Sequence, residues 1–124
     1  MAQNGRFGLS LKVLAVLAAK PDAMHTPVAI AEQLGESAVM VRRTFLQLHT
    51  AGFILQRKGP TGGAKLKLPA KEIGLGDIFA ATAGDWLALP DAAAASLTRR
   101  AQKDAVAAMN DTTLAQISKR LRNS

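Results

Sequence analysis

The apolar positions in the first fifty residues follow helical periods, and start and stop signals divide them into three helices. Residues 6–19 carry apolar side chains on nearly every face of a helix, which is typical of a helix buried on more than one side. A Pro-Asp pair ends it. In MHTPVAIAEQLG, Thr26 is a suitable N-cap, Pro27 suits the first helical position and Gly35 closes the helix. The apolar stripe of this short helix is Val28, Ile30, Ala31 and Leu34.

A third helix is predicted from Ala38 to Ala51, capped by Ser37 and ended by Gly52. Its inward positions are Ala38, Val41, Phe45 and Leu48, and its outward and flanking positions are Val39, Arg42, Arg43, Leu46, Gln47 and Thr50. Two helices that are joined by Gly-Glu-Ser, the second with arginines facing outward, predict a helix-turn-helix.

Beyond the third helix the period changes from helical to strand-like. The runs FILQRK and AKLKL predict two short strands, and GPTGG between them has the length of a hairpin loop. A basic hairpin directly after a helix-turn-helix predicts the wing of a winged helix, here residues 53–69. The stretch RKGPTGGAK approaches a nucleotide-binding P-loop. However, Ala64 and Leu66 stand where that motif needs Gly and Ser or Thr, so a nucleotide hydrolase is disfavoured.

Helical signals return in the second half of the chain. Residues 73–82 predict a short helix, and a connection that contains Trp86 separates it from a long Ala-rich helix at about residues 91–109. The sequence Thr-Leu-Ala-Gln at 113–116 is a capping box that opens a last helix.

The long helix carries a stripe of small and aliphatic residues that a compact monomer cannot fully bury. We expect it to pack on a second copy because C2 dimers are the commonest oligomers, with packing on the first helix of the same chain as the alternative. The residues expected in the dimer interface are Leu97, Ala101, Ala105, Ala108, Leu114 and Ile117. The predicted fold is therefore mainly α with a small β-hairpin (α+β). It comprises a winged helix-turn-helix domain at 1–82, and a connection with C-terminal dimerisation helices at 83–124.

Charge indicates the kind of partner. Residues 1–69 carry nine Lys and Arg against three acids, a net charge of +6, whereas residues 70–124 carry a net charge of +1. This uneven charge is expected of a protein that binds a polyanion, although a basic surface that merely favours solubility is the alternative. The absence of cysteine excludes disulfides and thiolate metal sites, and we expect no cofactor or metal.

The sequence favours neither a membrane protein nor an enzyme. Lys12 interrupts the apolar run at 9–19, so we expect no signal peptide, no membrane association and a cytoplasmic location. The carboxylates are scattered and no Ser/His/Asp spacing is evident, so no catalytic residues are expected.

The outward face of the third helix and the wing together predict contact with double-stranded DNA. Arginine reads guanine and glutamine reads adenine in the major groove, and the wing glycines let the backbone approach a phosphate strand or enter the minor groove. For any single residue a solvated charge is the alternative, and for the wing a hairpin without a ligand. The predicted DNA-contacting residues are Asn4, Arg6, Thr26, Ser37, Val39, Met40, Arg42, Arg43, Gln47, Arg57, Lys58, Gly59, Thr61, Gly62, Gly63 and Lys65.

Five stretches occur in a fixed order along nearly the whole chain: RFGLSLKVLAVLA, IAEQLGESAVMVRRTFLQLHTAGFI, RKGPTGGAKLKL, KEIGLGDIFAA and TLAQI. Together they resemble the Rrf-type family of bacterial transcription regulators, which includes IscR, NsrR and CymR. The resemblance implies a homodimer that is built on the long C-terminal helix and binds a near-palindromic operator.

The iron-sulfur members of that family have three cysteines before the long helix, but TAGDWLALPDAAAA has none, so the chain resembles the cluster-free branch. In this connection Trp86 is the candidate for lining an effector pocket, with a hydrophobic anchor against the long helix as the alternative.

We therefore expect a transcription repressor that binds two half-sites about one or two helical turns apart. The alternative is a protein-interaction module of the same fold, which senses a metabolic enzyme or a small effector and binds DNA weakly. An RNA-binding winged helix is disfavoured because aromatic side chains for base stacking are scarce.

Overall fold

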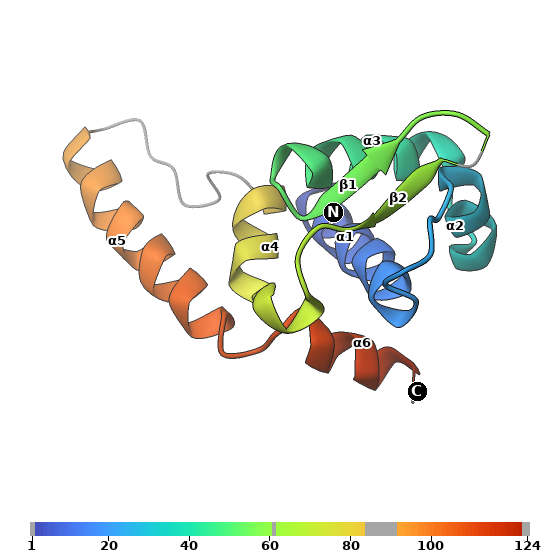
Figure 1. Cartoon of the computed structure of the whole chain (residues 1–124). Helices are drawn as coiled ribbons and strands as arrows, with labels where there is room; N and C mark the ends of the chain where they lie inside the picture. The colour runs from blue at the N-terminus through green and yellow to red at the C-terminus, as the bar shows by residue number, and fades with distance from the viewer. Residues whose placement is uncertain (1, 61, 84–91, 123–124) are drawn as a thin grey trace.

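The computed structural model describes residues 2–60, 62–83 and 92–122, and it is mainly helical with one antiparallel hairpin (Figure 1). The elements in chain order are α1 (Ala2–Ala19), α2 (Pro27–Leu34), α3 (Ala38–Thr50), β1 (Ile54–Arg57), β2 (Gly63–Leu66), the 3-10 turn η1 (Ala70–Glu72), α4 (Leu75–Ala83), α5 (Ala92–Met109) and α6 (Leu114–Arg122). Within this described part, every helix is too short or too polar to cross a membrane. The predicted fold class is confirmed.

Helix α1 lies at the centre of the fold. Val13, Leu14 and Leu17 are fully buried, and the helix packs against α6, α4, α3, α2 and β2. A helix with apolar side chains on nearly all faces is stable in water only when neighbours cover those faces. The expectation that the first helix is buried on more than one side is therefore confirmed.

Two side-chain caps fix the start of α2 and the start of α3. The Oγ1 of Thr26 accepts a hydrogen bond from the backbone N–H of Ala29 at 3.1 Å. The Oγ of Ser37 accepts from the N–H groups of Val39 and Met40 at 3.2 and 3.4 Å. Both caps are as predicted, and each satisfies donors that its helix leaves free. The turn between the two helices runs from Gly35, which has a left-handed φ of +68, to the Ser37 cap.

The inward faces of these helices form the core with α1. Val41, Phe45 and Leu48 of α3 are buried, as the helical wheel predicts. In α2, Ile30 is buried, but Val28 is exposed, so its predicted place in the apolar stripe is wrong. The core-facing residues of α2 are Ile30 and Ala31, which are buried, and Leu34, which packs against the core.

The hairpin is anchored to the segment before α2. Strands β1 and β2 pair antiparallel, with Ile54 opposite Leu66 and Arg57 opposite Gly63. On the edge of β2 that faces away from β1, Ala64 pairs with His25. The His25 N–H donates to the Ala64 carbonyl at 2.9 Å, and the Ala64 N–H donates to the His25 carbonyl at 2.8 Å. The wing is therefore held at a fixed place beside the helix-turn-helix.

Helix α5 is attached to the rest of the fold near its C-terminal end. The Asn110 side chain accepts from the Asp77 N–H at 3.0 Å and donates to the Asp77 carboxylate at 3.1 Å. Gly76 lets α4 approach closely, because an added Cβ would collide with the Val106 carbonyl oxygen. Figure 1 shows the N-terminal part of α5 projecting away from the other helices.

The C-terminal helix α6 returns to α1 and belongs to the core. Thr113 and Gln116 form the predicted capping box, with the Thr113 N–H donating to Gln116 Oε1 at 2.9 Å. Leu114 is 0% exposed within a single chain, so its expected place in a dimer interface is wrong: it has no surface to offer a partner. The predicted domain boundary at residue 83 stays a prediction. Helix α6 lies beyond it in the sequence but packs on α1, which belongs to the predicted N-terminal domain.

Candidate nucleic-acid interface

Helix α3 forms a ridge on the surface, because only its inner face is needed for the core. Val39 and Leu46 lie seven residues apart, which is two helical turns, and both are exposed. Arg42 and Arg43 are also exposed and flank this line. The predicted outward face of the third helix is therefore the face that the fold leaves open.

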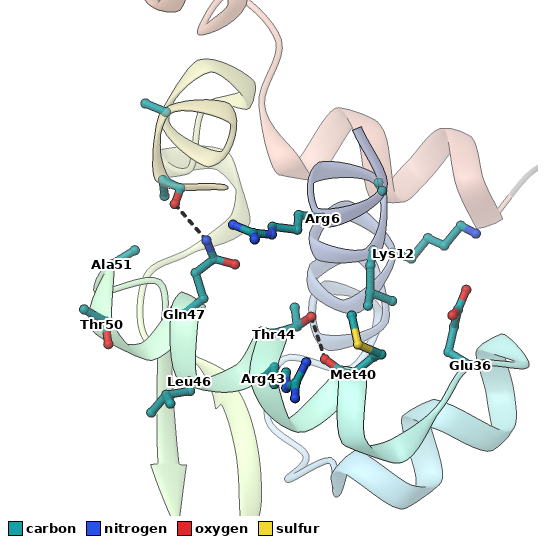
Figure 2. A pocket seen from close by; sticks show the side chains of 15 residues that line it. Arg6, Lys12, Glu36, Met40, Arg43, Thr44, Leu46, Gln47, Thr50 and Ala51 are labelled. Atoms are coloured by element: carbon teal, nitrogen blue, oxygen red, sulfur yellow. Dashed lines mark hydrogen bonds between the residues drawn. The ribbon is translucent and has the colours of Figure 1, made fainter. Parts of the chain in front are cut away.

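A groove of about 1300 Å³ runs along one side of this ridge, between α3, the first half of α1 and the end of α4. Its described lining includes the cations Arg6, Lys12 and Arg43 and the carboxylate of Glu36. Figure 2 shows Arg6 extending from α1 into this groove, toward the side of Gln47 on α3. Residues from distant parts of the chain thus gather positive charge on one side of the ridge.

A second groove, of about 570 Å³, lies on the other side of the ridge, between α3 and the wing. Arg42 projects into it from α3, and Arg57 and Lys58 line it from the wing. Its lining also includes glycines of the wing and the start of α2, namely Thr26, Pro27, Gly59, Gly62 and Gly63. Cations therefore flank the ridge on both sides.

Most of the residues predicted to contact DNA line one of these two grooves or the ridge between them. Thr26 and Ser37 serve as helix caps, which uses their hydroxyl oxygens as acceptors. Lys65 is half-buried on β2 opposite Leu55 and is not among the described lining residues of either groove. Thr61 and Trp86 lie outside the described residues, as do the side chains of Asn4 and Leu97.

Gln47 has a partner within the chain. Its Nε2 donates to the carbonyl oxygen of Ala81 at 3.1 Å, so the side chain ties α3 to the end of α4 (Figure 2). A role in reading a base stays a prediction. A single contact could use Oε1, but a bidentate contact with adenine needs both Oε1 and Nε2 and would therefore require the loss of the hydrogen bond to Ala81.

Lys12 and Leu46 are among the residues of this surface that are absent from the predicted set. Lys12 is exposed and lines the first groove. The sequence indicates it only as the one cation that interrupts the apolar run of the first helix. Leu46 lines both grooves, and its signal is its wheel position two turns after Val39. The predicted set includes the apolar Val39 and Met40 of the same helix but neither Leu46 nor Lys12.

The helix expected to form a dimer offers a surface of small side chains. Ala101 and Ala108 of α5 are exposed, and Ala105 is half-buried. Ile117 is half-buried on α6, which packs on α1. The alternative, in which the long helix packs on the first helix, is not what the structure shows: α6 occupies that place, and α5 contacts α4.

The family comparison gives one match over nearly the whole chain. A family model described as Rrf2, iron-dependent transcriptional regulator, matches residues 4–123. No curated protein matches the chain.

Several solved structures share the fold. CymR of Staphylococcus aureus is 26% identical, with a TM-score of 0.69 over 92% of this chain and 95% of that chain. CymR (YrzC), described as the global cysteine regulator of B. subtilis, is 21% identical, with a TM-score of 0.73 over 92% and 93%. IscR of T. potens is 22% identical, with a TM-score of 0.71 over 94% and 85%.

The iron in the family's description does not fit the donor atoms of this chain. The sequence contains no cysteine, so no thiolate can hold an iron-sulfur cluster. Among the described residues, no three or more His, Asp or Glu side chains gather where they could hold a metal ion. We therefore assign no role to iron.

Replacing Gly63 with alanine should detach the wing from the body. Gly63 has φ +135, and an added Cβ would lie 2.5 Å from the His25 carbonyl oxygen. We expect a loss of about 1–3 kcal/mol from overpacking, in addition to about 1–2 kcal/mol for the left-handed backbone, in urea unfolding at fixed protein concentration. The Ala64 amide should also lose its protection from hydrogen exchange.

Gly59→Ala is the matched control for this variant. Gly59 also has a positive φ, of +105, but an added Cβ there would meet nothing within 4 Å. It should show the backbone cost alone and keep Ala64 protected. Equal protection of Ala64 in both variants would show that the bond to His25 does not anchor the wing.

Proposed function

The chain belongs to the Rrf2 family of transcriptional regulators, and from this premise we propose that it is a DNA-binding repressor that acts as a homodimer on a near-palindromic operator. It would act in the cytoplasm, where bacterial promoters are. The observation that carries the proposal is the exposed ridge of α3 with cations on both sides. That arrangement matches a duplex, whose major groove is bordered by two phosphate strands.

Helix α3 is proposed to enter the major groove. Arg42 and Arg43 lie on opposite sides of its ridge, so each can reach either a guanine edge or a phosphate. Arg6 and Lys12, on the far side of the first groove, are placed to contact the backbone of one strand. Contacts to phosphate would supply most of the affinity, and contacts to base edges the selectivity.

The wing is proposed to contact the adjacent minor groove. Arg57 and Lys58 are exposed at the base of its loop, and the exposed Gly59 carries no side chain that would hold the backbone away from DNA. The two hydrogen bonds to His25 hold this loop in place before DNA arrives, which lowers the entropy lost on binding.

Helix α5 is proposed to form the dimer. It projects from the fold, and its exposed Ala101 and Ala108 allow close approach of another helix. A second copy supplies such a helix, and two-fold symmetry then presents two copies of α3 to two half-sites. The same stripe also suits the alternative function, in which a different protein binds α5 and the chain acts as a sensor.

Arg43→Ala and Lys58→Ala should weaken DNA binding in different ways. Loss of a guanine contact at Arg43 should relax base preference by about 1–3 kcal/mol at one position. Loss of a phosphate contact at Lys58 should weaken all sequences alike and flatten the salt slope by about one unit. Fluorescence anisotropy on selected and scrambled duplexes across a salt series measures both. Identical behaviour of the two variants on every duplex would contradict base reading by α3.

Ala101→Glu should convert the dimer to a monomer, because the new carboxylate would be desolvated between two helices. Ala107→Glu is the matched control: the same substitution on an exposed alanine of α5, but about a third of a turn around the helix from Ala101. Sedimentation velocity should show a monomer for the first and a dimer for the second. A wild-type chain that sediments as a monomer would instead favour the sensor function with a different partner for α5.

A further inference from the structure

The crest of α3 is apolar, although arginines stand on both sides of it. Val39 is 54% exposed and Leu46 is 64% exposed. The two side chains lie within about 20° of each other around the helix axis, so they form one line along it. Leu46 also borders both grooves, which places it at the highest part of the ridge.

The core does not account for these side chains. Val41, Phe45 and Leu48 supply the inward face of α3, whereas more than half of the surface of Val39 and of Leu46 faces solvent. Exposed aliphatic side chains cost free energy in water, roughly in proportion to their apolar area. An apolar pair at the centre of a binding surface gains free energy only when the ligand covers it with apolar groups.

The ligand must also match the surrounding charge. Arg42 and Arg43 flank the crest, and Arg6 and Lys12 stand beyond the first groove. A purely apolar partner would leave these cations desolvated without counter-charges. The major groove satisfies both requirements, since phosphates border it and the 5-methyl groups of thymine are its apolar features.

We propose that Val39 and Leu46 read the 5-methyl groups of thymine, and that these contacts determine part of the operator sequence. Seven residues of helix span about 10.5 Å, which is about three base-pair steps of 3.4 Å. The half-site should therefore carry two thymines at most about three base pairs apart, because a helix that is inclined to the duplex axis in the major groove advances along it by less than its own length. This inference rests on the proposed DNA binding and names the bases that the same surface selects.

The test compares two pools of duplexes with the same randomised core. One pool is amplified with thymidine triphosphate and the other with deoxyuridine triphosphate, which differ only by the 5-methyl group. The bound fraction of each pool is sequenced after several rounds of selection. We expect two thymine positions per half-site to be enriched in the first pool and to lose their enrichment in the second.

Single substitutions then assign each methyl group to a side chain. In the best duplex of the thymine pool, uracil at either position should weaken binding about fourfold, because one methyl-sized group is no longer buried. With Leu46→Ala, the thymine-to-uracil ratio should fall to about one at one position and stay unchanged at the other. Val39→Ala should do the reverse.

Leu121→Ala serves as the control, because Leu121 is an exposed leucine on α6, away from the ridge. It should keep the wild-type ratio at both positions. Circular dichroism and sedimentation of each variant check that the fold and the dimer persist, which the exposure of Leu46 leads us to expect.

The outcomes separate this inference from the function it rests on. Sequence-selective, salt-dependent binding that is equal for thymine and uracil duplexes would overturn methyl reading and leave DNA binding intact. Absence of salt-dependent binding to both pools would overturn the proposed function and this inference with it. In that case the apolar crest would belong to a protein contact.

Discussion

The burial of helix α1 is the constraint on which the rest of the structure depends. Its side chains are apolar on nearly every side, so α3, α4, α6 and the hairpin must all pack around it. Once they do, α3 can turn only one face inward, and its outer face is left to solvent beside the cationic start of α1. The candidate site is thus a consequence of how a single helix is covered.

Short local interactions make this surface rigid. The caps at Thr26 and Ser37 fix the starts of α2 and α3, and the pairing of His25 with Ala64 fixes the wing beside them. Each bond is worth only about 0.5–1.5 kcal/mol. Their shared effect is geometric, because they hold the cationic helix α3 and the cationic wing beside each other, and a preorganised surface loses little entropy when a duplex binds.

Much of the fold could be predicted from the sequence, because caps and apolar periods are local signals. The capping box at Thr113 and the wing glycines are examples. The predictions that failed concern which neighbour a side chain faces once the helices have packed together. Leu114 carries the same helical pattern whether it faces α1 or a second chain, and Gln47 reads as a free polar group until Ala81 is brought beside it. Leu46 was placed on the flank of the third helix but not among the DNA contacts, because the sequence alone does not show that two grooves meet at it.

The central claim is that two copies of α3 occupy the major groove of one duplex while the wings contact the minor groove. Dimethyl sulfate footprinting on a selected duplex tests it directly, because the reagent methylates guanine N7 in the major groove and adenine N3 in the minor groove. We predict two dyad-related patches of protected guanine, about one or two helical turns apart, with protected adenines on their flanks. A single patch, or protection of adenine alone, would contradict the account.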